Sequence, residues 1–160
     1  MSRRTDPLPG PDPMLRPAPV TPAPVAAPFS LDLRVYWEDT DAGGVVFYAN
    51  YLRFFERART EWLRGFGVSQ EALRLKEGAM FVVSETAVRY LLPARLDDLL
   101  RITVAPQPPG RASLTVSQQA WLGDTLLAEG MIRIGCVDSQ SLRPRRMPAS
   151  LLIHLSDPCA

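Results

Sequence analysis

The chain has 160 residues, enough for one domain of ordinary size and a tail. Its residues are 46% hydrophobic and 22% charged, as is typical of a globular protein, and no run of 18 apolar residues is present that could span a membrane. The formal net charge of +1 excludes a general field that would attract nucleic acid or an anionic membrane, so any anion must be bound by a local cluster.

The first 28 residues contain nine of the chain's 16 prolines. Each proline removes a backbone donor and fixes its own φ, so this spacing blocks both helices and sheets. The segment has no continuous apolar stretch of the secretory type. We predict a disordered Pro-rich tail over residues 1–30, which either has a function or reflects an over-extended start. A folded domain over 31–155 and a flexible C-terminus over 156–160 are expected to follow.

A short strand is predicted at the start of the domain, because Leu33, Val35 and Trp37 alternate with polar neighbours. The Asp- and Gly-rich turn over residues 39–44 then ends this strand.

A long amphipathic helix is predicted from Ala49 or Asn50 to about Phe66. Its apolar residues recur at steps of three or four: Leu52, Phe55, Ala58, Trp62 and Phe66. Glu56 and Arg59 stand one helical turn apart and are expected to form a structural ion pair rather than a catalytic one.

Four strands in direct succession are predicted after the helix, over residues 80–92, 100–104, 114–122 and 126–136, with a short terminal turn over 150–155. Consecutive strands joined by short turns form an antiparallel sheet, and one amphipathic helix can cover a face of it. The sequence therefore predicts an α+β fold in which the sheet wraps around one long α-helix.

Cysteine and histidine usage excludes several kinds of site. Cys136 and Cys159 form no CxxC pair, which fits a reducing compartment and predicts a cytoplasmic protein. His154 is the only histidine and lies near the end of the chain, which excludes a Ser-His triad or a histidine-based metal site in the body of the domain. We expect neither a metal nor a cofactor.

The loop before the helix is the candidate active site. Asp41 is followed by Gly43 and Gly44, and two valines then lead into the helix N-terminus. Free N–H groups at a helix start favour negative charge. A carboxylate beside them supplies a base or nucleophile together with donors for a developing oxyanion, which acyl transfer requires. A side chain that merely caps the turn is the alternative interpretation.

The run YWEDTDAGGVVFYANY, over residues 36–51, resembles the signature of the 4-hydroxybenzoyl-CoA thioesterase family. Within that family it is most similar to the branch of YbgC-type acyl-CoA thioesterases associated with the Tol–Pal system. Shorter matches are FERARTE over 55–61, PARLDD over 93–98 and RPR over 143–145. The resemblance covers roughly residues 33–153. It implies a hot-dog fold, with subunits paired through their sheets as a homodimer or homotetramer and active sites at the interface.

The resemblance also implies an activity, the hydrolysis of an acyl-CoA thioester to a free carboxylic acid and CoA. An acyl carrier protein is a further candidate partner. Asp41 is then the nucleophile or the general base, and the sequence leaves both open. The backbone N–H of Tyr48 would polarise the thioester carbonyl. Many YbgC-type sequences have a histidine at this position, whereas the 4-hydroxybenzoyl-CoA thioesterases with the same signature have tyrosine.

The phosphates of CoA call for a basic cluster, and Arg143, Arg145 and Arg146 form the densest one outside the tail. The forked donors of arginine suit phosphate oxygens, although a solvated basic loop is the alternative. Two other function classes share this fold. A hot-dog dehydratase would need a histidine base near the helix, which is missing. A non-enzymatic scaffold for acyl-carrier or phospholipid machinery linked to the Tol–Pal envelope system would tolerate loss of Asp41, which this sequence keeps.

Overall fold

Five strands and one long helix make up most of the structure, a computed structural model that describes residues 29–156. The elements in chain order are β1 (Phe29–Arg34), the 3-10 turn η2 (Trp37–Asp39), α1 (Asn50–Gly65), α2 (Gln70–Ala72), the π-helical turn η3 (Leu73–Glu77), β2 (Ala79–Tyr90), β3 (Leu99–Pro106), β4 (Ser113–Leu122), β5 (Thr125–Asp138) and α3 (Ala149–Ser156). The predictions for residues 1–28 and for the last four residues lie outside the described part of the chain.

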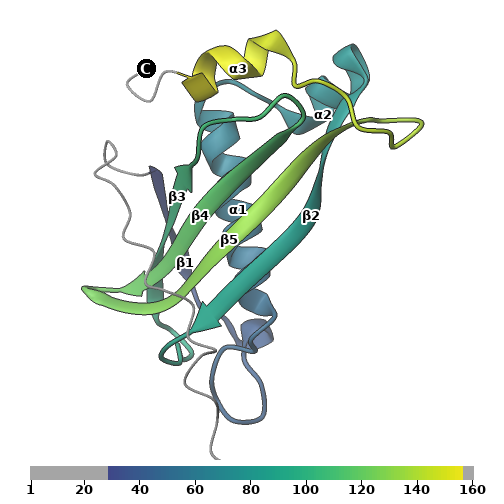
Figure 1. The fold of residues 1–160 in the computed structure, drawn as a ribbon. Helices are drawn as coiled ribbons and strands as arrows, with labels where there is room; N and C mark the ends of the chain where they lie inside the picture. The colour runs from purple at the N-terminus through teal and green to yellow at the C-terminus, as the bar shows by residue number, and fades with distance from the viewer. Residues whose placement is uncertain (1–28, 157–160) are drawn as a thin grey trace, which may run out of the picture.

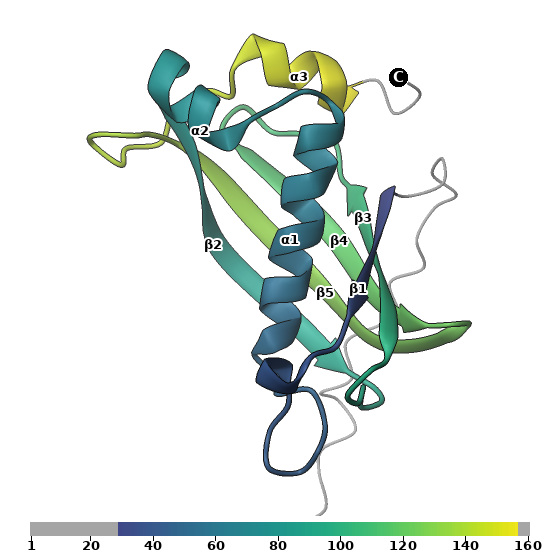
Figure 2. The same ribbon diagram turned by 180° about the vertical axis from the view of Figure 1, so that it is seen from behind.

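The five strands form one antiparallel sheet in the order β1-β3-β4-β5-β2. Figures 1 and 2 show that this sheet curves around α1, with α3 across one end. The predicted α+β arrangement of an antiparallel sheet wrapped around one long helix is therefore confirmed. No helix within residues 29–156 is long and apolar enough to cross a membrane.

The sheet and α1 bury their apolar faces against each other. Along β4, buried residues alternate with half-buried ones, as expected for a strand with one face on a core. The buried residues of α1 are Asn50, Tyr51, Phe54, Phe55, Ala58, Trp62 and Leu63. The helix lies very close to β5 at one point, because a Cβ atom added to Gly130 would be only 2.9 Å from a ring carbon of Phe55. Leu52, predicted to be buried, is 41% exposed.

The predicted first strand is wrong at its C-terminal end. β1 begins at Phe29, two residues before the predicted domain start, and ends at Arg34. The Asp39 carboxylate accepts a hydrogen bond from the Tyr36 N–H (2.9 Å), which folds the next residues into η2. Trp37 is consequently 79% exposed instead of lying on the inner face of a strand.

The segments at the far end of α1 also differ from the sequence prediction. The short helices α2 and η3, which fill the connection from α1 to β2, were not predicted. The predicted terminal turn over 150–155 is the eight-residue helix α3. Both segments lie at the same end of the sheet (Figure 1), where they cover the C-terminal part of α1.

Candidate active site

The loop between η2 and α1 is fixed to its surroundings by several hydrogen bonds. The Phe47 N–H donates to the Asp39 carbonyl (2.9 Å), and so does the side-chain amide of Asn50 (2.9 Å). The Val46 N–H donates to the carbonyl of Ala94, in the connection between β2 and β3 (2.9 Å). The loop is therefore ordered by its own backbone and by a distant segment.

The two aspartates of this loop have different environments. Asp39 is only 2% exposed, and its carboxylate accepts a hydrogen bond from the Tyr36 N–H. The Asp39 side chain therefore has a structural role. Asp41 is exposed, and one of its carboxylate oxygens, Oδ1, accepts a hydrogen bond from the Gly43 N–H (2.8 Å). No donor within residues 29–156 bonds to the other oxygen. Asp41 thus presents a partly unpaired carboxylate to solvent.

Both glycines of the motif have a steric reason for being there. A Cβ atom at Gly43 would lie 3.1 Å from Oδ1 of Asp41 and would crowd the carboxylate. Gly44 has φ +72°, in the left-handed region that residues with a side chain rarely adopt. The glycines therefore permit the turn in which the Gly43 N–H binds the Asp41 carboxylate, in the loop that leads into α1.

Several backbone donors at the start of α1 have no acceptor. In the part of the chain that the structure describes, neither the Tyr48 N–H nor the Ala49 N–H donates a hydrogen bond, whereas the N–H groups of Phe47 and Asn50 do. The side chain of Tyr48 is 62% exposed. Its carbonyl accepts a hydrogen bond from the Tyr90 hydroxyl (3.0 Å). The Tyr48 N–H, the expected oxyanion donor, thus has no acceptor within residues 29–156.

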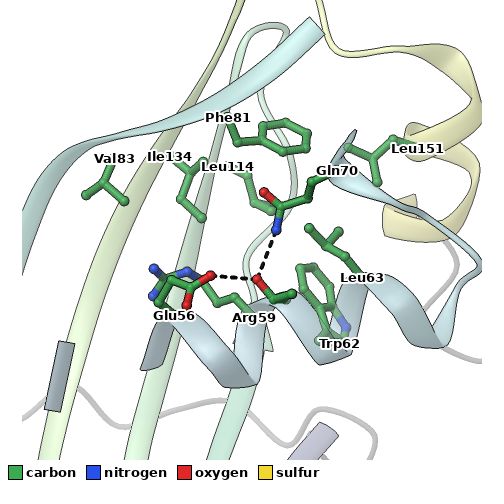
Figure 3. A pocket seen from close by; sticks show the side chains of 11 residues that line it. Glu56, Arg59, Trp62, Leu63, Gln70, Phe81, Val83, Leu114, Ile134 and Leu151 are labelled. Carbon is green, nitrogen blue, oxygen red and sulfur yellow. Dashed lines mark hydrogen bonds between the residues drawn. The ribbon is translucent and has the colours of Figure 1, made fainter. Parts of the chain in front are cut away.

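A cavity of about 230 Å³ lies elsewhere in the molecule, between the C-terminal half of α1 and the inner face of the sheet (Figure 3). Its lining is mainly apolar and comes from α1, β2, β4, β5 and α3: Trp62, Leu63, Phe81, Val83, Leu114, Ile134 and Leu151. Phe81 of β2 is one of the aromatic residues that line this cavity. Phe54 and Phe55 are buried in the core instead.

One wall of the cavity is polar. The Gln70 amide donates to the Thr60 hydroxyl (3.0 Å), which donates to the Glu56 carboxylate (2.7 Å), as the dashed lines in Figure 3 show. The Arg59 guanidinium donates to the side-chain oxygen of Gln118 (2.7 Å). Burial lowers the pKa of Arg59, and the nearby Glu56 opposes that shift. The ion pair predicted between Glu56 and Arg59 is wrong, since each group has another partner.

The sequence pattern of the thioesterase-like superfamily matches residues 35–155. The chain belongs to this superfamily. The acyl-CoA thioester hydrolase YbgC of Escherichia coli is 45% identical, over 78% of this chain and 92% of its own length. The acyl-CoA thioesterase YbgC of Haemophilus influenzae is 40% identical, over 75% of this chain and 88% of its own length.

Solved structures of the superfamily have the same fold. A probable thioesterase from Bartonella henselae superimposes with a TM-score of 0.72 at 33% identity, covering 76% of this chain and all of that one. A 1,4-dihydroxy-2-naphthoyl-CoA thioesterase from Synechocystis gives a TM-score of 0.76 at 18% identity, over 82% of this chain and 97% of that one. The family and the hot-dog fold predicted from the sequence are confirmed.

The structure of this superfamily member does not bring the predicted arginines to Asp41 within one chain. Arg145 donates to the carbonyl of Glu77 (2.7 Å), just before β2, whereas Tyr90 at the other end of β2 contacts Tyr48. β2 has 12 residues, so its ends are roughly 36 Å apart at the usual rise of a strand. The Arg143 side chain is exposed in the same distant loop as Arg145.

Metal ligands do not gather in this part of the chain. Between residues 29 and 156, no three His, Cys, Asp or Glu side chains lie close enough together to hold a metal ion. His154 lies on α3, where its ring stacks on Phe66 with centroids 5.4 Å apart.

Two features, one at the loop and one at the cavity, were not predicted from the sequence. Tyr90 was not singled out, although its position at the end of a strand that precedes a proline-containing turn was visible. The hydrogen bond from Arg59, in the polar wall of the cavity, to Gln118 was also not predicted, because Gln118 reads as one polar residue in an alternating strand.

Proposed function

We propose that this chain hydrolyses acyl-CoA thioesters to a free carboxylic acid and CoA, with Asp41 as the catalytic residue. The observation that carries the proposal is an exposed Asp41 carboxylate in the loop that leads directly into α1, where the Tyr48 and Ala49 N–H groups have no acceptor within residues 29–156. Membership in the thioesterase-like superfamily, and relatives named acyl-CoA thioester hydrolases, support it.

Two mechanisms are compatible with one ionised carboxylate. Asp41 attacks the thioester carbonyl, expels the CoA thiolate and forms a mixed anhydride, which water then hydrolyses to the acid. Alternatively, Asp41 removes a proton from a water molecule that attacks the carbonyl directly, and the thiolate leaves from the tetrahedral intermediate. In both cases the oxyanion forms next to the Tyr48 N–H, and a donor at that position lowers the barrier.

The cavity is the candidate acyl pocket, because its apolar lining suits a hydrocarbon or aryl group. The cavity lies beside the C-terminal half of α1. Its lining residue Thr60 is ten residues after Asn50, where the helix begins, so the cavity is about 15 Å along the helix axis from the Asp41 loop of the same chain. The proposed acyl pocket and the proposed phosphate-binding arginines therefore share one end of the molecule, opposite Asp41.

A symmetric pairing of two chains would remove this separation. β2 is an edge strand whose outer side has no partner among the described strands. If two copies pair antiparallel along β2 about a two-fold axis, the Tyr90 end of one chain lies beside the Ala79 end of the other. Arg143 and Arg145 of one copy would then approach Asp41 of its partner. We therefore propose a homodimer, or a homotetramer built from it, with active sites at the interface.

Subunit mixing tests this interface. An Asp41→Asn chain and an Arg143→Glu chain are each expected to hydrolyse a CoA ester poorly at low substrate concentration. After unfolding and co-refolding of equal amounts, half of the dimers should be mixed. Each mixed dimer should have one site with both residues intact, giving roughly a quarter of wild-type activity. Activity no higher than the mean of the two variants would place Asp41 and Arg143 in the same chain's site. A stable monomer in light scattering would contradict the proposed interface directly.

The activity itself is tested by measuring thiol release from a panel of acyl-CoAs, from short aliphatic to aryl and long-chain esters. Turnover by the wild type and its loss in Asp41→Asn would support the proposal. No turnover across the panel would favour the non-enzymatic scaffold. Turnover of acyl carrier protein thioesters but not of CoA thioesters would show that the substrate's acyl group is attached to acyl carrier protein instead of CoA. We further propose a cytoplasmic location, since Cys136 is a buried free thiol.

A further inference from the structure

Tyr90, the last residue of β2, contacts the start of α1. Its hydroxyl donates to the carbonyl of Tyr48 at 3.0 Å, a contact between residues 42 positions apart. No main-chain donor within residues 29–156 bonds to that carbonyl. The Leu52 N–H, which would reach it in a regular helix, donates to the Ala49 carbonyl instead (3.1 Å). The Tyr90 hydroxyl is thus the partner that the helix itself does not provide.

This contact determines the orientation of one of the unpaired donors at the start of α1, the Ala49 N–H. A peptide unit is planar, so fixing its carbonyl oxygen also fixes the N–H of the following residue. The peptide that carries the Tyr48 N–H is held locally, because its Phe47 carbonyl accepts from the Asn50 N–H (2.8 Å). The next peptide unit contains the Tyr48 carbonyl and the Ala49 N–H. Its carbonyl accepts the hydrogen bond from the Tyr90 hydroxyl.

We propose that Tyr90 is a positioning residue, which fixes the Tyr48–Ala49 peptide so that the Ala49 N–H acts as a second oxyanion donor beside the Tyr48 N–H. The proposal rests on the proposed thioester hydrolysis. Two adjacent donors aimed before the reaction stabilise a tetrahedral intermediate more than one donor does, because no reorganisation is required as charge develops.

The packing around Tyr90 supports an ordered anchor. Its ring makes edge contacts with Tyr51 (5.5 Å between centroids) and Tyr48 (6.3 Å). Burial raises the pKa of the Tyr90 phenol, with Tyr48 adding to the shift, so the hydroxyl stays protonated and able to donate at neutral pH.

Tyr51 offers a matched control from the same aromatic cluster. It is 2% exposed, and its hydroxyl has no hydrogen-bond partner in the described chain. The Ala94 backbone is near enough to oppose the rise that burial causes in the Tyr51 pKa, but the geometry is not that of a hydrogen bond. Tyr51→Phe therefore removes a phenol oxygen next to Tyr90 without breaking a contact.

The experiment compares the wild type, Tyr90→Phe and Tyr51→Phe on one acyl-CoA ester. Tyr90→Phe keeps the ring and is expected to lower kcat about tenfold, less than the loss of a whole oxyanion donor, with KM within about twofold of the wild type. Tyr51→Phe should leave kcat and KM unchanged. The melting temperature of Tyr90→Phe should stay close to that of the wild type, because the Tyr90 hydroxyl contact is exposed. That of Tyr51→Phe should be equal or higher, because the change removes a buried hydroxyl without a hydrogen-bond partner.

Each result has one meaning. An active wild type with full kcat in Tyr90→Phe overturns the positioning role and leaves the proposed hydrolysis standing. A raised KM at unchanged kcat would make Tyr90 a substrate contact and also overturns it, as does an equal fall in kcat for Tyr51→Phe. A wild type without turnover on any ester refutes the proposed function, and this proposal with it.

Discussion

Replacing a carboxylate by an amide should have opposite consequences at the two aspartates of the loop. We expect Asp41→Asn to abolish most activity at unchanged stability, and Asp39→Asn to lower stability while the chemistry continues. The two side chains are two positions apart, so the pair of variants separates a chemical role from a structural one within a single turn.

The expected magnitude at Asp41 follows from its exposure. Within residues 29–156 its carboxylate accepts one hydrogen bond, from the Gly43 N–H, and an asparagine oxygen accepts the same bond. Substitutions at such exposed positions change the free energy of unfolding by about 0.5 kcal/mol or less. The amide can act neither as a nucleophile nor as a base, so kcat should fall by about a hundredfold or more.

At Asp39 the contacts are buried. Its carboxylate accepts the Tyr36 N–H, and the residue is 2% exposed. An asparagine oxygen still accepts that bond, but the new NH₂ group adds buried donors, and an unsatisfied buried group costs about 1–3 kcal/mol. With about 4 °C of melting temperature per kcal/mol for a domain of this size, Tm should fall by about 4–12 °C.

Activity is measured as thiol release at a temperature well below the melting temperatures of both variants. Thermal unfolding is monitored by circular dichroism, and the oligomeric state is measured by light scattering. Near-full activity in Asp41→Asn would refute the assigned mechanism. A large loss of kcat in Asp39→Asn at unchanged Tm would show that the chemical and structural roles were exchanged.

Three further changes test other parts of the structure. Gly130→Ala should lower the free energy of unfolding in urea by about 1–3 kcal/mol, because the added Cβ meets the Phe55 ring, and an unchanged midpoint would mean that the helix can shift. Arg143→Glu should raise KM about 10- to 150-fold for a CoA ester but not for a pantetheine ester, and equal effects would place Arg143 away from the phosphates. Deleting residues 1–28 should leave Tm and activity unchanged, since proline at that density cannot offset its ordering entropy, and a loss of either would show that the tail packs on the domain.

The elements that the sequence predicted well are those with long, regular periodicity. The predicted helix differs from α1 by about one residue at each end, and the four later strands lie within a few residues of β2 to β5. The error at Trp37 has a local cause. The alternation of apolar and polar residues continues to Trp37 in the sequence, but the Asp39 side chain accepts the Tyr36 N–H and turns the chain there. A single side-chain contact of this kind leaves no periodic signal.

The loop of the candidate site was predictable because its parts are adjacent in sequence. Asp41, the two glycines and Tyr48 lie within eight positions and carry a recognisable motif. The tie from Tyr90 to Tyr48 joins two chain segments that only the fold brings together. The distance between Asp41 and the loop with Arg143 and Arg145 could not be predicted from the sequence either. It depends on which end of β2 each of the two segments lies beside.

The misassigned partner of Arg59 shows why local spacing was insufficient. A separation of three positions lets Glu56 and Arg59 meet on a helix, but exposed pairs of that kind contribute little. Gln118 is 1% exposed, so its amide must find both a donor and an acceptor inside the fold. The Arg59 guanidinium supplies the donor at 2.7 Å and the Phe55 carbonyl the acceptor at 3.0 Å. Leaving a buried amide unpaired costs more free energy than breaking an exposed ion pair. The orientation of the Arg59 side chain is therefore determined by Gln118 on the sheet and not by Glu56 on the same helix.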